Sequence, residues 1–413
     1  MIHNPKRSAE LIKKDASWYD YYAGFSRSFT QSALRAATPP PDSIILDPWN
    51  GAGTTTKTCS LEGFKSVGID LNPAMVVISK AQLVTQSDVE FAIGRCSSLN
   101  SNFKVEVRED DALTAWFCPE SVQMIRKIEK SILKINKFNS LEGKVDSLSY
   151  SQCFQYVVLF NIVRQYLSPF IPTNPTWIKK AQTEDEKVRL KWKALRDDFI
   201  GGAYKLSESI DYVSMQNSQI KTASSINIPL EDSSVDLVLS SPPYCTRIDY
   251  AVATLPELAI LSVSGLEEIT PIRKSLMGAT TVPKSVNEGA MFGPICEEFL
   301  SKVKTHSSRA SSTYYYKNFY QYFYDLSHSV SEILRVLKPG GKCFLVVQDS
   351  YYKDIHCDLA SIIVQFFSAN GGLLVNSYDF VSKNNMANIN PRGRKYRVKT
   401  KAVESVIELT KAE

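Results

Sequence analysis

The sequence predicts an α/β protein with a doubly wound, mostly parallel sheet and a mainly helical inserted subdomain. Short apolar runs at 43–47, 65–70 and 235–239 are each followed by turn residues, as buried parallel strands are. A stretch with apolar residues at helical spacing, 319–337, precedes a further apolar run at 342–349. Strands that alternate with helices are typical of an open sheet covered on both faces.

The composition excludes several classes of protein. The chain has 413 residues, with 48 Lys and Arg against 43 Asp and Glu, a net charge of +5, and 44% hydrophobic residues. These proportions exclude a disordered, collagen-like or coiled-coil chain. No apolar run reaches the roughly 18 residues of a membrane helix, and residues 1–15 lack the apolar segment of a signal peptide. We therefore expect a cytoplasmic protein without membrane contact.

The first strand, helix and strand lie within residues 43–70. The run SIILD (43–47) ends on an acid, residues 48–56 form the turn, 57–64 form a short helix, and KSVGID (65–70) is the second strand. This order of elements is how a doubly wound sheet begins.

Two more units continue the sheet later in the chain. SSVDLVLSSPPY (233–244) is an apolar strand that runs into a turn with two prolines. The helix expected at 319–337 stops at LKPGG (337–341), and the strand KCFLVVQD (342–349) follows it. We expect all of these strands to share one sheet.

Residues 91–221 interrupt this pattern and are expected to form a mainly helical insertion. Between 121 and 210 there are 15 Lys and Arg against 9 Asp and Glu, an excess of 6 that is larger than the net charge of the whole chain. The insertion is therefore a basic part of the protein. A second stretch, 251–313, lacks clear periodicity and is expected to be a long irregular excursion.

The loop after the first strand has the composition of a ligand-binding turn. Asp47 ends the strand, Gly51 and Gly53 permit a tight backbone path, and Thr54 begins a helix whose free amide hydrogens point into the turn. Small side chains there allow a ligand to lie against the backbone. A purely structural turn and a generic nucleotide loop are the alternatives to a specific cofactor loop.

A second acid favours a ribose-containing ligand. Asp70 ends the next strand, about 20 residues after the glycines, where a carboxylate can accept hydrogen bonds from ribose hydroxyls. The loop lacks the lysine of a phosphate-binding GxxxxGK[ST] motif, and Thr56 stands where the GxGxxG fingerprint has its third glycine. The ligand that fits these residues contains ribose but no pyrophosphate.

The turn SSPPY (240–244) is the predicted catalytic segment. It follows an apolar strand, so it lies at the carboxyl edge of the sheet, where open α/β folds bind ligands. Pro242 and Pro243 keep the backbone extended and remove two amide donors. The Ser241 hydroxyl and the Pro242 carbonyl can then accept both hydrogens of an exocyclic amine, and the Tyr244 ring offers a base a surface for stacking. A stiffened strand exit without chemistry is the alternative.

Taken together, these segments resemble the S-adenosylmethionine-dependent amino-group DNA methyltransferases. DPWNGAGTT (47–55) is similar to their motif I and SPPY (241–244) to their motif IV, in the serine form that resembles the cytosine-N4 enzymes. YYAGFSRSF (21–29) resembles motif X, and GIDLNP (68–73) resembles motif II. The resemblance implies a Rossmann-like class I methyltransferase fold with S-adenosyl-L-methionine as the cofactor. The cofactor-binding residues that it implies are Tyr22, Phe25, Asp47, Pro48, Gly51, Gly53, Thr54 and Asp70.

The resemblance also implies how the chain is divided. Residues 1–90 are the cofactor-binding part of the methyltransferase domain, and 222–413 are its catalytic part, which includes the excursion at 251–313. The helical insertion 91–221 is then a candidate target-recognition domain. The excursion could take that role instead, or the insertion could be purely structural.

The expected reaction is methyl transfer to the exocyclic N4 amine of a cytosine in DNA. The resemblance assigns catalysis to Ser241, Pro242, Pro243 and Tyr244. A base in double-stranded DNA must rotate out of the stack to reach a concave pocket, so a flipped cytosine is expected. The alternatives are adenine-N6 methylation, methylation of RNA or of a protein glutamine amide, and an inactive nucleic-acid-binding subunit. A partner from a restriction or defence system is compatible with the resemblance.

Several other residue types in the sequence can carry chemistry. Cys245 follows the SPPY turn directly, but a nucleophilic cysteine is expected next to a proline, as in carbon-5 cytosine enzymes, and Tyr244 intervenes. The scattered cysteines and histidines show no metal-ligand spacing, so no metal site is expected.

Three further segments have both a functional and a structural interpretation. The basic run PRGRKYRVKTK (391–401) could contact nucleic-acid phosphates or form a charged edge strand. RIDY (247–250) could line the pocket or form a solvated loop. The aromatic group TYYYKNFYQYFY (313–324) is expected to lie in the core rather than to stack on bases.

Overall fold

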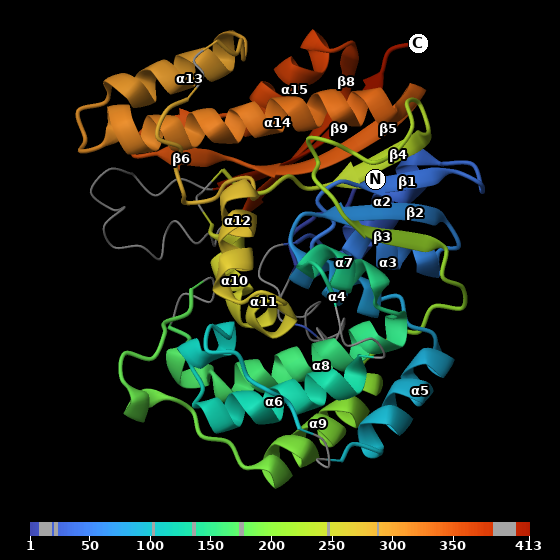
Figure 1. The fold of residues 1–413 in the computed structure, drawn as a ribbon. Coiled ribbons are helices and arrows are strands. Elements are labelled where there is room, and N and C mark those ends of the chain that lie inside the picture. Colours follow the sequence, from blue (N-terminus) through green and yellow to red (C-terminus); the bar gives the residue numbers. More distant parts are fainter. Residues whose placement is uncertain are drawn as a thin grey trace.

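A seven-stranded, mostly parallel sheet forms the centre of the fold (Figure 1). The structure is a computed structural model that describes residues 1–7, 19, 24–100, 104–133, 138–172, 177–245, 248–286, 289–382 and 402–413. The strands of the sheet are β1 (Ile44–Asp47), β2 (Lys65–Asp70), β3 (Ser218–Thr222), β4 (Val235–Ser240), β5 (Leu337–Gln348), β8 (Gly372–Ser382) and β9 (Ala402–Lys411). A separate two-stranded sheet pairs β6 (Ser350–Tyr352) with β7 (Ile355–Cys357).

The strand order is β3-β2-β1-β4-β5-β9-β8. The pairs β3–β2, β2–β1, β1–β4 and β4–β5 are parallel, whereas β9 runs antiparallel to both β5 and β8. The chain starts at β1 in the middle, moves outward to β3, and then returns to fill the other half from β4. The expected doubly wound α/β fold of the Rossmann-like class I methyltransferase type is confirmed.

The predicted elements of the first unit form where the apolar pattern placed them. β1 and β2 are almost entirely buried, because helices cover the sheet on both faces. The helix α3 (Thr54–Leu61) begins directly after Gly53, at the Thr54 that was predicted to start it. Gly53 has φ +86°, and a Cβ atom at this position would lie 2.8 Å from the Cβ of Ser79. Only glycine fits there without displacing the neighbouring helix.

Helices on both sides of the sheet cover these strands. Those of the sheet domain are α2 (Arg27–Ala37), α3, α4 (Pro73–Ala81), α14 (Tyr316–Val336) and α15 (Leu359–Ala369). The long helix α14 packs one apolar face on the sheet and contains most of the aromatic group 313–324. Phe319, Tyr320, Tyr322 and Phe323 are buried there. The expectation that this aromatic group lies in the core is therefore confirmed.

The segment LKPGG belongs to a strand, not to the turn that the sequence predicts. β5 begins at Leu337, which pairs with Val235, and the register then shifts so that Lys342 pairs with Leu237. Gly340 has φ +71° within this irregularity. The turn residues therefore form a bulge, because strand pairing on both sides holds the backbone in the sheet.

Between α4 and β3 the chain forms a helical lobe on one side of the sheet (Figure 1). Its helices are α5 (Gln86–Ser97), α6 (Pro119–Ile132), α7 (Leu141–Ser147), α8 (Tyr150–Tyr166) and α9 (Trp192–Ser207). The helix α8 lies at the centre of this lobe and is buried along most of its length. The chain rejoins the sheet at Ser218, inside the range that the sequence analysis assigned to the insertion.

The stretch 251–313 is largely helical, so the expectation of an irregular excursion is wrong. It contains most of α10 (Tyr250–Ala253), then α11 (Leu255–Leu261), α12 (Leu266–Ser275) and α13 (Pro294–Thr305). The first three helices are short, and α12 contains Pro271, so their local periodicity is weak. Packing against the helical lobe compensates for this, since α11 contacts α4 and α8.

A buried ion network joins the helical lobe to α11. The Glu129 carboxylate lies 2.6 Å from Arg126 Nη1 and 2.5 Å from Lys144 Nζ. Arg126 also lies 2.8 Å from Asp111, and Lys144 Nζ donates to the Leu261 carbonyl at 2.7 Å. Because α11 follows the SPPY turn closely in the chain, this network connects the lobe to the catalytic half.

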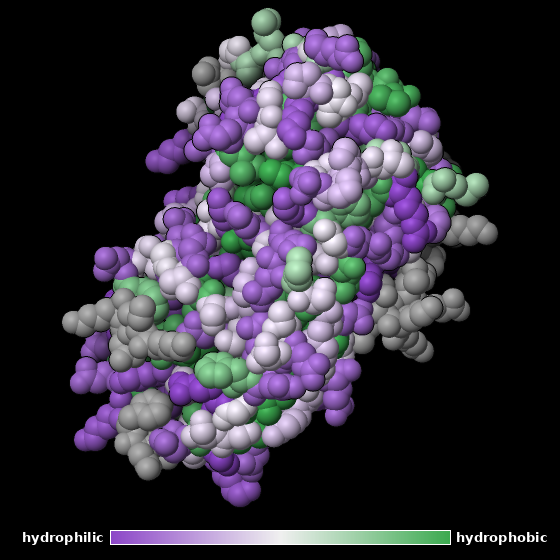
Figure 2. All heavy atoms as spheres, turned by 90° about the vertical axis from the view of Figure 1, so that its right-hand side faces the viewer, coloured by the Kyte–Doolittle hydropathy of each residue, from purple (hydrophilic) through white to green (hydrophobic). Residues whose placement is uncertain are grey.

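The surface is predominantly hydrophilic on the face drawn in Figure 2, where hydrophobic residues occur only in small groups. Within the residues that the structure describes, no helix combines the length and the apolar character needed to span a bilayer. The apolar side chains are instead gathered in the core clusters on the two faces of the sheet and in the helical lobe.

Replacing Glu129 should destabilise the protein strongly. Glu129→Ala leaves Lys144 buried without its carboxylate and Arg126 with Asp111 alone, and removing one partner of a buried pair costs about 3–5 kcal/mol. Glu298→Ala is the matched control, because Glu298 forms an exposed pair with Lys302 whose loss should change the stability far less. Urea unfolding of both variants measures the difference. Equal losses would contradict the assigned importance of the network.

Candidate active site

The ends of β1 and β4 lie side by side at the carboxyl edge of the sheet. The two strands pair directly, with Ile45 opposite Leu237 and Leu46 opposite Val238. As a result, the Ser240 hydroxyl donates a hydrogen bond to the Asp47 carboxylate. The Thr55 hydroxyl donates to the Leu239 carbonyl at 3.1 Å. The glycine loop and the SPPY turn, nearly two hundred residues apart in sequence, therefore meet at one edge.

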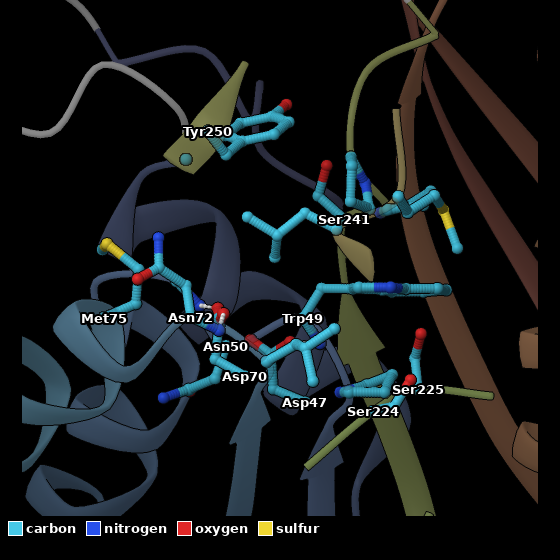
Figure 3. A pocket seen from close by; sticks show the side chains of 18 of the residues that line it. Asp47, Trp49, Asn50, Asp70, Asn72, Met75, Ser224, Ser225, Ser241 and Tyr250 are labelled. Atoms are coloured by element: carbon cyan, nitrogen blue, oxygen red, sulfur yellow. Dashed lines mark hydrogen bonds between the residues drawn. The ribbon is translucent and has the colours of Figure 1, made fainter. Parts of the chain in front are cut away.

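One cavity lies over this edge and contains most of the predicted site residues (Figure 3). It encloses about 1100 Å³ when its open mouth is included. The predicted residues that line it are Phe25, Asp47, Pro48, Gly51, Thr54, Asp70, Ser241, Pro242, Pro243 and Tyr244. Gly53 does not line the cavity; it is the N-cap residue of α3. Tyr22 and the basic run 391–401 lie outside the described residues.

Asp47 and Asp70 hold the glycine loop in place. Asp47 accepts a hydrogen bond from the Trp49 amide at 3.1 Å, and Asp70 accepts from the Gly51 amide at 2.9 Å and from the Asn72 amide at 2.8 Å. Burial raises the pKa of each carboxyl to about 6. Both groups are therefore mostly ionised at neutral pH. They fix the loop conformation in addition to the ligand roles predicted for them.

Asn50 and Gly68 support this loop, and the sequence analysis missed both roles. The Asn50 side chain is buried against Gly68 on β2, and its Oδ1 accepts a hydrogen bond from the Thr56 hydroxyl at 3.1 Å. A Cβ atom on Gly68 would lie 2.5 Å from Asn50 Cγ. Gly68 therefore leaves space for the loop, a contact between the glycine loop and β2 that no local motif reveals.

The hydrogen bonds around the SPPY turn leave acceptors on Ser241. Its hydroxyl donates to the Val346 carbonyl at 2.8 Å, so the lone pairs of the same oxygen stay available to a hydrogen-bond donor in the cavity. The Tyr322 hydroxyl donates to the Pro243 carbonyl at 2.8 Å, and the Tyr244 amide donates to the Tyr250 hydroxyl oxygen at 3.1 Å. The turn is thus held from β5, α14 and α10.

Several cavity residues were not expected from sequence. They come from the glycine loop, the β3–β4 loop, α10, the residues around the end of α12, and α14, and they include Trp49, Ser224, Ser225, Tyr250, Met277 and Asp325. Tyr250 belongs to RIDY, for which lining the pocket was one of two interpretations. Its neighbour Asp249 instead caps α10 and pairs with Arg273 at 2.7 Å. Arg247 lies outside the described residues.

The structure does not favour Cys245 as a nucleophile. Its side chain is buried, and burial raises the pKa of the thiol well above its ordinary value. The reactive thiolate is therefore disfavoured. Among the described residues there is no group of three or more His, Cys, Asp or Glu side chains that could hold a metal ion.

The site fits a ribose-containing cofactor. The glycine loop packs closely against α4 and β2 because Gly53 and Gly68 lack side chains. Asp70, at the end of β2, lies in the wall of the cavity. The fold and this cavity together define a class I methyltransferase architecture.

Comparison with known proteins supports the same class. No family model matches the chain. It is 25% identical over 390 residues to the type II methyltransferase M.AvaI of Nostoc sp. (strain PCC 7120 / SAG 25.82 / UTEX 2576), covering 85% of this chain and 78% of the relative. It is 23% identical over 365 residues to the type II methyltransferase M.MvaI of Kocuria varians, covering 81% and 76%. The protein is a methyltransferase, and its cofactor is S-adenosyl-L-methionine.

Two further comparisons gave lower similarity. The type II methyltransferase M.BsoBI of Geobacillus stearothermophilus is 22% identical over 305 residues, which cover 65% of this chain and 57% of that protein. A solved structure of a SAM-dependent methyltransferase from Methanosarcina mazei aligns over 95% of this chain and 99% of its own, with a TM-score of 0.32 and 9% identity.

Gly68→Ala should weaken cofactor binding without unfolding the protein. The new methyl group would force Asn50 out of its position, and overpacking of this kind costs about 1–3 kcal/mol. Because Asn50 is part of the glycine loop, affinity for S-adenosylhomocysteine should fall about tenfold. The control is Gly94→Ala on α5, where nothing lies within 4 Å of the added Cβ atom. Calorimetric titration measures both, and unchanged affinity in the Gly68 variant would contradict the proposed support of the loop.

Proposed function

We propose that this methyltransferase acts on DNA and transfers its methyl group to the exocyclic N4 amine of cytosine. One observation carries the proposal: the Ser241 hydroxyl lies in the same cavity as the cofactor-loop residues, and its proton is already donated to Val346. Its oxygen is then an acceptor for an amine hydrogen. The similarity to type II methyltransferases and the serine form of the SPPY turn support the choice of substrate.

The residues of the turn would activate the amine by orienting it. The lone pair of such an amine is delocalised into the ring, which makes it a poor nucleophile. Hydrogen bonds to the Ser241 oxygen and the Pro242 carbonyl would hold both hydrogens and favour tetrahedral geometry at nitrogen. The lone pair is then localised and directed across the cavity. Bound S-adenosylmethionine supplies the electrophilic methyl group.

The concave shape of the site supports a target base that lies outside the helix stack. Tyr244 lines a concave cavity over the sheet edge, which a base inside a duplex cannot enter. A flipped base could lie against the Tyr244 ring, where stacking stabilises it. The Tyr244 backbone is fixed by its bond to Tyr250, so the ring is held on a rigid segment.

We further propose that the helical lobe contributes to target recognition. The stretch 121–210 is basic, as a surface near DNA phosphates would be. The Glu129 network connects this lobe to α11. Arg164 on α8 also pairs with Glu257 on α11. Contacts made by the lobe are therefore mechanically linked to the segment that follows the catalytic turn.

Adenine is the second candidate substrate. Its N6 amine offers the same two hydrogens to Ser241 and Pro242, and the stacking surface of Tyr244 accepts either base. RNA methylation, methylation of a protein glutamine amide and an inactive nucleic-acid-binding subunit are the remaining alternatives, and the molecule that receives the label distinguishes them.

Nucleoside analysis should identify N4-methylcytosine. The protein is incubated with unmethylated genomic DNA and methyl-labelled cofactor, the DNA is digested to nucleosides, and the labelled product is identified by mass. Label in N6-methyladenine, or label found only when RNA is supplied, would reject cytosine in DNA as the substrate. DNA binding without any transfer of label would favour the inactive subunit.

Ser241→Ala should reduce turnover far more than it reduces cofactor affinity. Removing one positioned hydrogen-bonding group from a transition state commonly lowers the rate about 100-fold. S-adenosylhomocysteine affinity should change little, because Ser241 is assigned to the methyl acceptor. The control is Ser301→Ala on α13, an exposed serine outside the cavity. Single-turnover rates and calorimetry measure both quantities, and a parallel loss of rate and affinity would count against the assigned role.

A further inference from the structure

The helix α14 meets the cavity at Asp325, and two further polar side chains at helical spacing, Tyr322 and Ser329, contact neighbouring parts of the site. The Tyr322 hydroxyl binds the Pro243 carbonyl at 2.8 Å, and the Ser329 hydroxyl lies 2.8 Å from that of Ser225 in the β3–β4 loop. Asp325 lies between them on the same face, since positions i, i+3 and i+7 of a helix are aligned. The two anchored neighbours therefore fix the position of Asp325 in the cavity wall.

Asp325 lies one helical turn before Ser329, which contacts Ser225 of the β3–β4 loop, and it shares the cavity wall with that loop. This loop leaves β3, which pairs with β2, and β2 ends at Asp70, the predicted ribose ligand. In Figure 3 the Trp49 ring lies between Ser241 on one side and the Ser224–Ser225 pair on the other. A base attached to a ribose at Asp70 would therefore lie near Trp49 and the two serines.

The Asp325 carboxyl accepts fewer hydrogen bonds from the described residues than the other two cavity carboxyls do. Asp47 and Asp70 each accept two hydrogen bonds from the protein. For the Asp325 carboxyl, the described residues provide one, from Gln321 Nε2 at 2.8 Å. Burial raises the pKa of Asp325 to about 6, while Gln321 and His328 lower it. At neutral pH the group is therefore mainly a carboxylate, which accepts hydrogen bonds but does not donate them.

We propose that Asp325 accepts a hydrogen bond from the exocyclic amine of the cofactor's adenine and thereby selects adenine over other purines. A flat ring can lie against Trp49, while its amine, which donates two hydrogens, requires an acceptor in the wall. Asp325 supplies that acceptor on the side of the cavity where the ribose is expected. The inference rests on the cofactor assignment and does not depend on the identity of the methyl acceptor.

The test compares two product analogues that differ at a single group. S-adenosylhomocysteine carries the amine, and S-inosylhomocysteine carries a carbonyl oxygen in its place. Both are titrated calorimetrically into the full-length wild-type protein and the Asp325→Asn and Asp325→Glu variants. Asp354→Asn is the matched control, because Asp354 is exposed and lies outside the cavity. Thermal unfolding of each variant verifies that it is folded.

The wild type should bind the amine analogue at least about tenfold more tightly than the carbonyl analogue. The Asp325 carboxylate can accept a charge-assisted hydrogen bond from the amine, whereas the carbonyl oxygen has no hydrogen to donate. Asp325→Asn should lose or reverse this preference, because the new amide donates to a carbonyl oxygen. Asp325→Glu and Asp354→Asn should keep the sign of the preference. Asp325→Glu also tests the inference if the asparagine variant does not fold.

Three results would overturn the inference. The first is equal binding of the two analogues by the wild type. The second is an unchanged preference in Asp325→Asn. The third is a loss of methyl-transfer rate in that variant with the preference intact, which would assign Asp325 to the methyl acceptor instead. A failure of the DNA proposal would leave the analogue preference untouched, so the two proposals can fail independently.

Discussion

The site depends on the hydrogen bond between the Ser240 hydroxyl and the Asp47 carboxylate. Asp47 is buried, and a buried carboxylate must be hydrogen-bonded or neutral, because its desolvation is otherwise too costly. Its partners are the hydroxyl at the end of β4 and the amide of Trp49. The hydrogen bonds to the Asp47 carboxylate therefore bring the glycine loop and the catalytic turn into contact. Direct pairing of β1 with β4 makes the contact possible.

The rest of the cavity is arranged around that contact. α14 crosses the face of the sheet and touches the turn through Tyr322 and the β3–β4 loop through Ser329, so a single rigid helix sets the distance between the two ends of the site. The helical lobe is joined to α11 by buried charges rather than by apolar packing alone. A buried charged group that loses its partner destabilises the fold, so these ion pairs favour one fixed arrangement of lobe and sheet.

The strands and the main helix were predictable from local pattern, whereas much of the site was not. Apolar runs located β1, β2 and β4, because burial on both faces leaves a strong signal in a short segment. Asp325 and Tyr250 show no such signal: each is a polar residue on a helix, and only the packing of that helix directs it into the cavity. The helices within 251–313 were missed since each is short and stabilised by tertiary contacts.

The sequence by itself determined the class of fold, the order of the cofactor and catalytic segments, and the residue types at both loops, since these follow from hydrophobic periodicity and turn chemistry. Only the tertiary structure decided which side chains share the cavity. Strand order places segments nearly two hundred residues apart at one edge, and helix packing sets which face of α14 meets them. Neither relation is encoded in a local stretch of chain, because both arise from contacts between distant elements.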